Sequence, residues 1–148
     1  MRMTEEEYQE LINGRKAAQK KPPKYRNRKV TITDPKTGEE ITFDSQKECD
    51  YYFELLAREK AGEIFRIERQ VDFEIQPAFT DLAGKKHRAI TYKADFVYWE
   101  RINPHRIGDR IVSDDVKAHT IDVKGMKTEV YKLKKKLLAY QGVIIEEV

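Results

Sequence analysis

Residues 120–128, TIDVKGMKT, place the end of a strand and the start of a helix within one short stretch. Side chains two positions apart in a strand point to the same face, so Asp122 and Lys124 share a face while the alternate residues face the core. Gly125 permits a sharp turn or the close approach of a ligand. Thr128 has a side chain typical of a helix N-cap. The stretch therefore predicts a half-buried strand that presents a carboxylate beside an ammonium, followed by a helix.

The chain on either side of this stretch reads as further strands and helices. Ser45 and Glu48 form a capping box at the start of a helix that Gly62 ends. The predicted elements, in chain order, are a hairpin over 30–43, a helix over 45–61, strands over 64–79, 87–99 and 119–124, a helix over 128–140 and a strand over 143–148. This order predicts an α/β or α+β domain with a mixed β-sheet flanked by helices.

The same patterns predict which side chains are buried. In the strand over 87–99, even-numbered residues from 90 to 98 share one face, and odd-numbered residues from 91 to 99 share the other. Residues 101–118 are polar and irregular, which indicates a surface loop. The buried stripe expected for the second helix is Val130, Leu133, Leu137 and Tyr140. Surface or loop positions are expected for His87, His105 and His119.

Length and composition exclude several classes of protein. The 148 residues suffice for one domain with one core, and 39% hydrophobic with 37% charged residues is typical of a soluble globular protein. The sequence has no apolar run that would span a bilayer, and its N-terminus does not read as a signal peptide. Cys49 is the single cysteine, so no internal disulfide and no cysteine-based zinc site is expected. We expect a cytoplasmic protein with residues 1–24 as a short helix and basic flexible arm, and one domain over 25–148.

Basic residues are concentrated in two parts of the chain, although the net charge is only +3. Residues 15–29 contain eight lysines and arginines and no acid. The second group consists of Lys127, Lys132, Lys134, Lys135 and Lys136. Such clusters suit a polyanion, because each neutralised phosphate releases counterions. Solvated charged faces are the alternative interpretation.

Asp95 adds a second carboxylate to the argument. It lies among apolar residues of its strand, where a charge is costly unless it is paired or bound to a metal. If the two strands are neighbours, Asp95 and Asp122 reach one cation, and such hard oxygen ligands suit Mg²⁺ or Mn²⁺. Glu48 is a candidate third carboxylate, although the capping box alone accounts for it. The alternatives are a surface ion pair for Asp122 with Lys124 and a backbone-bonded buried Asp95.

Carboxylates, a neighbouring lysine and basic patches together point to phosphodiester hydrolysis. A metal polarises the scissile phosphate and lowers the pKa of a bound water. Lys124 orients that water or stabilises charge on the phosphate in the transition state. Gln76, near a strand end, is a further candidate for lining the site.

Several phrases, in order, resemble a branch of the PD-(D/E)xK nuclease superfamily: small phage and prophage proteins grouped with Holliday-junction resolvases. The phrases are KYRNRK, FDSQKECDYYFEL, KAGEI, ITYKADFVY and DVKGMKTEVYKLKKKLL. The resemblance implies a restriction-endonuclease-like core in which Asp95 is the first acid, Asp122 the (D/E) position and Lys124 the catalytic lysine. It further implies that Glu48 assists metal binding and that the carbonyl of Val123 is a ligand. Ala94 departs from the nominal pattern, which has proline there.

The function that this resemblance implies is a Mg²⁺-dependent (or Mn²⁺-dependent) endodeoxyribonuclease of a phage or prophage. Its expected substrate is branched DNA such as a Holliday junction, and paired cuts imply a homodimer with no membrane partner. The residues expected to bind DNA are Lys24, Arg26, Arg28, Lys29, Lys93, Lys127, Lys132 and Lys135. The alternatives are a nicking or duplex-cutting phage enzyme of the same fold, a DNA-binding phage protein without catalysis, and a structural module whose acids are ion-paired.

Overall fold

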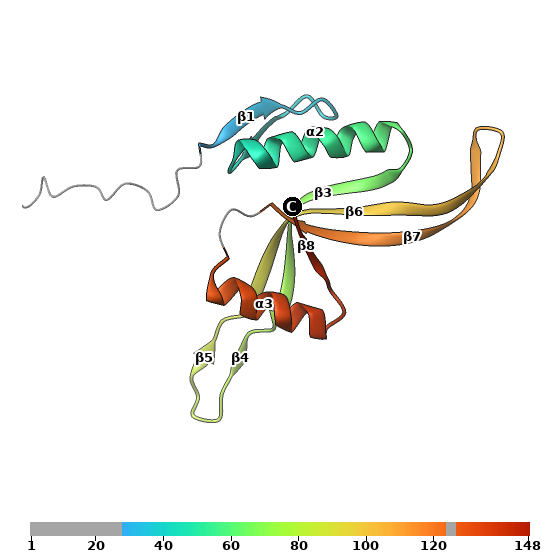
Figure 1. Ribbon diagram of the computed structural model, residues 1–148. Coiled ribbons are helices and arrows are strands. Elements are labelled where there is room, and N and C mark those ends of the chain that lie inside the picture. Colours follow the sequence, from blue (N-terminus) through green and yellow to red (C-terminus); the bar gives the residue numbers. More distant parts are fainter. Residues whose placement is uncertain (1–27, 124–126) are drawn as a thin grey trace, which may run out of the picture.

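A four-stranded sheet with a helix on each face forms the centre of the protein, as the computed structural model shows (Figure 1). The structure describes residues 28–123 and 127–148, with the side chains of 113–114 left out. The arm and helix expected over 1–24 lie outside the described residues. The elements are β1 (Val30–Thr33), β2 (Glu40–Phe43), α2 (Gln46–Lys60), β3 (Ile64–Gln76), β4 (Phe79–Thr80), β5 (Lys86–His87), β6 (Ile90–Ile107), β7 (Arg110–Asp122), α3 (Glu129–Tyr140) and β8 (Ile145–Glu147).

The central sheet has the strand order β3-β6-β7-β8. β3 pairs antiparallel with β6, and β6 with β7, whereas β8 pairs parallel with β7. Two further hairpins, β1-β2 and β4-β5, form separate two-stranded sheets. The prediction of a mixed α+β domain with a mixed sheet flanked by two helices is thereby confirmed.

Each helix packs on its own face of the sheet and creates its own core. On one side, Tyr52 and Leu55 of α2 pack with β-strand residues such as Phe96. On the other side, Tyr131 and Leu138 of α3 pack with residues such as Tyr92, Ala94, Val97 and Ile145. No helix in the described part of the chain is long and apolar enough to cross a membrane.

β6 changes face in its middle, which the alternation in sequence does not reveal. Tyr92 and Ala94 pack toward α3, whereas Phe96 and Tyr98 pack toward α2. The prediction that the even-numbered residues of this strand share one face was therefore wrong. The change coincides with a local irregularity of the partner strand, because Gln70, between the pairs Arg69↔Phe96 and Val71↔Ala94, has a φ of 51°. Asp95 lies at the point where the change occurs.

The loop predicted over 101–118 is instead a two-stranded arm that extends away from the sheet (Figure 1). β6 and β7 remain paired to their tip, where Ile107 lies opposite Arg110. Gly108 takes a φ of 60° there, as the first position of a tight type II′ hairpin turn requires. The prediction failed because a ribbon that stands off the core has no buried face, and so no apolar alternation marks it in the sequence.

The predicted second helix is confirmed, but its predicted buried stripe is wrong. Thr128 caps α3 by accepting a hydrogen bond from the backbone nitrogen of Tyr131 at 3.1 Å. Tyr131 and Leu138 are the buried residues, while Val130, Leu133, Leu137 and Tyr140 are exposed. Tyr131 donates to Glu147 of β8 at 3.0 Å and contacts the Tyr92 ring, and these contacts set the rotation of the helix.

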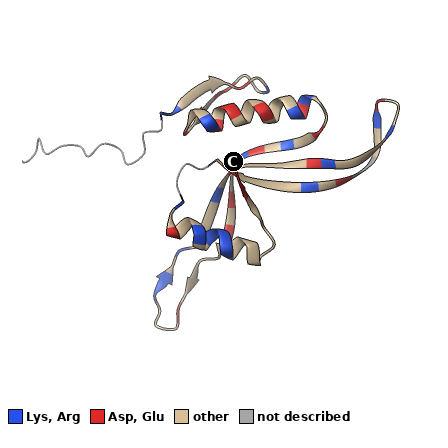
Figure 2. Ribbon diagram, in the orientation of Figure 1, with Lys and Arg blue, Asp and Glu red and all other residues tan. Residues whose placement is uncertain are grey.

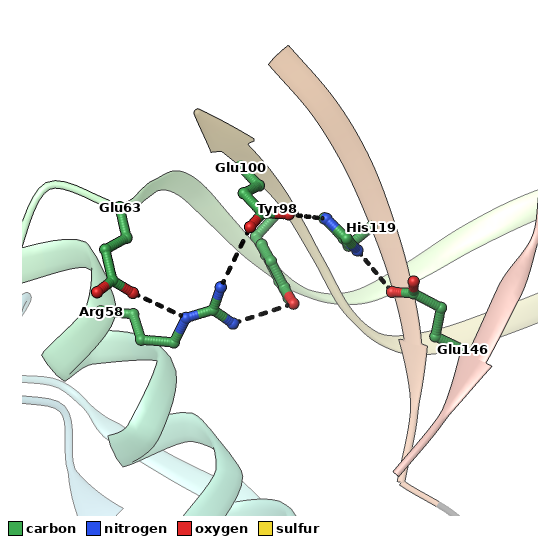
Figure 3. A network of polar contacts seen from close by, with 6 residues as sticks. All are labelled: Arg58, Glu63, Tyr98, Glu100, His119 and Glu146. Atoms are coloured by element: carbon green, nitrogen blue, oxygen red, sulfur yellow. Dashed lines mark hydrogen bonds and ion pairs between the residues drawn. The ribbon is translucent and has the colours of Figure 1, made fainter. Parts of the chain in front are cut away.

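His119 is buried, contrary to the expectation of a surface position, and it joins three strands (Figure 3). Its Nε2 lies 2.6 Å from Glu100 of β6 and its Nδ1 lies 2.6 Å from Glu146 of β8. Its ring stacks on Tyr98 at 5.0 Å, and Arg58 of α2 donates to the Tyr98 hydroxyl at 3.3 Å. This network holds β7 between its neighbours three residues before Asp122, and so helps to position that carboxylate.

Candidate active site

Glu48 brings the first carboxylate from α2. The predicted cap exists, because Ser45 Oγ accepts a hydrogen bond from Glu48 N at 3.1 Å. The Glu48 side chain reaches back to the nitrogen of Asp44 (3.3 Å) rather than to that of the cap residue itself. Its other oxygen accepts a hydrogen bond from Gln70 Nε2 at 3.1 Å. Glu48 is only 3% exposed, and burial raises the pKa of its carboxyl above the ordinary value, since these hydrogen bonds compensate only in part.

Asp95 links β6 to the end of β7. Its Oδ2 accepts a hydrogen bond from the backbone nitrogen of Val123 at 2.7 Å, and its Oδ1 faces Gln70 Nε2 at 3.5 Å. Val123 directly follows Asp122, so the bond places the two aspartates on neighbouring strands at the same level. The expected hydrogen bond of Asp95 to the backbone is therefore present, but Asp95 is half-buried rather than buried, and its position is compatible with a role in binding a ligand.

Asp122 is the most deeply buried of the three acids, with 1% of its surface exposed. The hydroxyl of Tyr92 on β6 donates a hydrogen bond to Asp122 Oδ2. Burial, followed by this hydrogen bond, raises the pKa of Tyr92, so that the phenol stays protonated and remains a donor. A carboxylate at this depth is not a surface group, which removes the interpretation of Asp122 as part of an exposed ion pair.

Gln70 was missed by the sequence reading, which named Gln76 instead. Gln70 lies on β3 between the pairs Arg69↔Phe96 and Val71↔Ala94, and hence opposite Asp95. Its side-chain amide faces both Glu48 and Asp95, and so bridges α2 to β6. Gln76 is exposed at the far end of β3 and has no such contact with a described residue. A lone glutamine in an irregular strand gives no sequence signal, so only the fold could identify it.

The backbone of Gln70 has a φ of 51°, which is unusual for a residue with a Cβ atom. We expect Gln70→Gly to be more stable than Gln70→Ala by about 1 kcal/mol, the reverse of the usual order in a strand. Both variants lose the amide, so their difference reports the backbone alone. Urea unfolding in EDTA measures it, with Gln76→Gly and Gln76→Ala as the matched pair. A more stable alanine variant at position 70 would show that the backbone is unstrained.

The donor types at this site suit a hard divalent cation. Carboxylates of Asp95 and Asp122 and the carbonyl of Val123 are oxygen ligands of the kind that Mg²⁺ and Mn²⁺ prefer. In the described ranges 28–123 and 127–148, however, no three acidic, histidine or cysteine side chains are gathered as a ready metal cluster. The Gln70 amide between Glu48 and Asp95 contributes to that separation. Each carboxylate oxygen has a second lone pair, so these acids can bind a cation while they keep their present hydrogen bonds.

The remaining predicted site residues divide into two groups. Lys124, the predicted catalytic lysine, and the predicted DNA ligands Lys24 and Arg26 lie outside the described residues. Most of the others form ion pairs with acids of the protein. Lys127 and Lys135 both pair with Glu147. The other pairs are Lys29 with Asp44, Lys93 with Asp72 and Lys132 with Glu129. Hydrogen bonds from Lys127, Lys135 and Tyr131 lower the pKa of Glu147 to about 2. These lysines are thus partly neutralised within the protein.

Fold and site together define a mixed α+β domain with three acids from α2, β6 and β7 near one end of the central sheet. The chain belongs to the family described as protein of unknown function (DUF1064), whose model matches residues 22–146. Comparisons with curated proteins and with solved structures give no match.

Proposed function

We propose that the protein is a metal-dependent DNA endonuclease that hydrolyses phosphodiester bonds. The observation that carries the proposal is the position of Asp95 and Asp122 at one level of adjacent strands. Asp95 accepts a hydrogen bond from the nitrogen of Val123, the residue after Asp122, and Gln70 links Glu48 to Asp95. The chain order of helix, three strands, helix and strand (α2-β3-β6-β7-α3-β8) supports it, because this is the order of the core in the nuclease superfamily that the sequence resembles.

Each residue has a distinct part in the proposed chemistry. Asp95, Asp122 and the Val123 carbonyl hold the cation, which when bound polarises the phosphate and acidifies a water molecule. Glu48 adds negative charge from α2 and orients that water. Lys124 follows Asp122 by two positions in the sequence, and the resemblance assigns it the positive charge that stabilises the developing charge on the phosphate. Tyr92 fixes the orientation of the Asp122 carboxylate by its hydrogen bond.

Branched DNA is the proposed substrate, with a homodimer making paired cuts. This part rests on the resemblance in sequence, since fold and catalytic residues do not specify a substrate. A nicking or duplex-cutting enzyme with the same site is the alternative within this class. A DNA-binding protein without catalysis is the alternative from another class. Two buried acids, Glu48 and Asp122, beside the half-buried Asp95 count against it, because phosphate binding gains nothing from them.

One assay separates these possibilities. Wild-type protein is incubated with a labelled four-way junction and with a linear duplex of the same sequence, in Mg²⁺, in Mn²⁺ and in EDTA. Symmetric nicks on the junction that require metal support the resolvase. Equal cutting of both substrates supports the duplex enzyme. DNA binding without cutting in either metal would contradict the nuclease and leave the binding protein.

The acid side of the pH profile is expected to depend on Glu48. Burial raises the pKa of Glu48 above 4.5, and only the ionised form serves the metal site, so activity falls as the pH drops through that raised pKa. We expect Glu48→Gln to lower kcat/KM about 10- to 100-fold and to move the remaining acid limb to lower pH. Profiles of kcat/KM for both proteins measure this. An unchanged limb in the variant would assign the titration to another group.

A further inference from the structure

The hairpin of β4 and β5 projects below α3 (Figure 1). Its turn is held by Asp81, whose Oδ1 accepts hydrogen bonds from the nitrogens of Ala83 (2.9 Å) and Lys85 (3.0 Å). The Oδ2 of Asp81 lies 2.8 Å from His87 Nε2, and the His87 ring stacks on Phe79 at 4.7 Å. A short hairpin with this many internal contacts presents its tip in one orientation.

The base of the hairpin is fastened to α3. Lys134 Nζ donates to the carbonyl of Thr91, and Gln141 Nε2 donates to the carbonyl of Ile75, each at 2.8 Å. The two acceptors flank the hairpin in sequence: Ile75 lies at the end of β3, and Thr91 lies at the start of β6. The tip is therefore held in a fixed position relative to α3 and to the sheet.

The tip combines an apolar apex with unneutralised positive charge. Leu82 at the apex is fully exposed. Lys85, Lys86 and Arg88 follow it and are exposed, and none of their side chains has a hydrogen-bond or ion-pair partner among the described residues. Figure 2 shows basic residues on β5 and along α3. The hairpin lysines thus differ from Lys93, Lys127, Lys132 and Lys135, which are paired with acids.

We propose that this hairpin is a DNA wedge: Lys85, Lys86 and Arg88 bind backbone phosphates, and Leu82 inserts against unstacked bases at a branch point. Free lysines and arginines gain affinity from phosphates by counterion release. An apolar apex gains nothing from a stacked duplex, but it can cover base faces that a junction, gap or flap leaves open. This inference rests on the proposed function and names the structural feature of the DNA that the protein recognises.

The position of the hairpin suits this role. Leu82 precedes Asp95 by thirteen residues, so at ~3.3 Å per residue the two lie at most about 43 Å apart. One turn of a DNA duplex, about 34 Å, falls within this limit. One protein molecule can therefore contact a branch point with the hairpin and a scissile phosphate on an adjoining arm with the acids.

The test measures binding in EDTA, so that it does not depend on cleavage. Fluorescence anisotropy gives the affinity of full-length protein for a four-way junction and for linear duplex over a range of salt concentrations, and 2-aminopurine at the branch reports unstacking. The variants are Leu82→Ser and the triple variant Lys85→Ala/Lys86→Ala/Arg88→Ala. The matched controls are Ile107→Ser and Arg106→Ala/Arg110→Ala, at the tip of the β6-β7 arm.

We expect the triple variant to bind both DNAs about 10- to 100-fold more weakly, with the salt slope reduced by about 2 to 3. Leu82→Ser is expected to keep duplex affinity, lose about tenfold on the junction and abolish the 2-aminopurine signal. Unchanged binding and salt slope in the triple variant, or equal junction and duplex affinities for Leu82→Ser and wild type, would overturn the wedge. Wild-type protein that shows these signatures but never cuts would contradict only the nuclease. Wild-type protein that binds no DNA would overturn both.

Discussion

Asp122→Asn is expected to abolish metal-dependent cleavage, with a loss of about 10³-fold or more, while the protein remains folded. Asparagine keeps an oxygen that accepts the hydrogen bond of Tyr92, so the buried position retains this partner. It removes the negative charge that a divalent cation requires from this ligand. Cleavage of labelled DNA in Mg²⁺ and Mn²⁺ measures the loss, and binding to the same DNA in EDTA shows that the surface for DNA is intact.

The matched control is Asp72→Asn, on β3 of the same sheet. Asp72 is exposed and lies 3.8 Å from Lys93, so its loss removes an ordinary surface ion pair. We expect cleavage by this variant to stay within about twofold of wild type, because surface substitutions away from a site have small effects. Cleavage by Asp122→Asn at the wild-type rate would remove Asp122 from the site and with it the proposed mechanism.

Asp34→Ala is expected to lower the free energy of unfolding by about 3 kcal/mol. Asp34 is buried and accepts hydrogen bonds from the nitrogen of Lys36 (3.0 Å), from Thr37 Oγ1 (3.2 Å) and from the hydroxyl of Tyr52 (2.9 Å). The last bond ties the β1-β2 hairpin to α2, and its loss leaves a buried hydroxyl without its partner. Denaturant unfolding measures the change, and a fall in Tm of ~6–12 °C accompanies it.

The effect of Asp34→Ala is expected to depend on pH with a defined sign. Burial raises the pKa of Asp34, but the hydrogen bonds from Lys36, Tyr52 and Thr37 outweigh it and leave the pKa below the ordinary 3.8. The stabilisation is therefore present above pH 3.8 and is lost as the pH falls through the lower pKa of the folded protein. Asp44→Ala, at an exposed position, is the control and is expected to cost under ~0.5 kcal/mol. A difference between wild type and Asp34→Ala that grows below pH 3.8 would contradict this account.

The order of the core elements and two of the helix caps were predictable, because caps and apolar periods are local properties of the chain. The β4-β5 hairpin was not predicted. Ser45 and Thr128 each accept the hydrogen bond from the residue three positions on, as their residue types predict. Burial within an element was less predictable. The face that α3 buries depends on the contacts of Tyr131 with Glu147 and Tyr92, which are distant in sequence. The apolar spacing within the helix therefore predicted the wrong buried face.

The candidate site shows the same division. Asp95 and Asp122 were recognisable in sequence, since a carboxylate in an apolar strand is an exception that residue types alone reveal. Gln70 was not, because its importance comes from a left-handed backbone and from two carboxylates supplied by other elements. Its position opposite Asp95 depends on the pairing of β3 with β6.

Residue types and their spacing by themselves determined the order of the core helices and strands, the helix caps and the choice of candidate acids, since each depends on neighbours a few positions away. Only the tertiary structure decided that 101–118 form an arm, that His119 is buried between Glu100 and Glu146, and that Gln70 joins Glu48 to Asp95. The physical reason is that pairing and burial are free-energy balances between residues far apart in the chain. The residues next to a polar strand or a lone glutamine in the sequence do not indicate which distant residues it will contact.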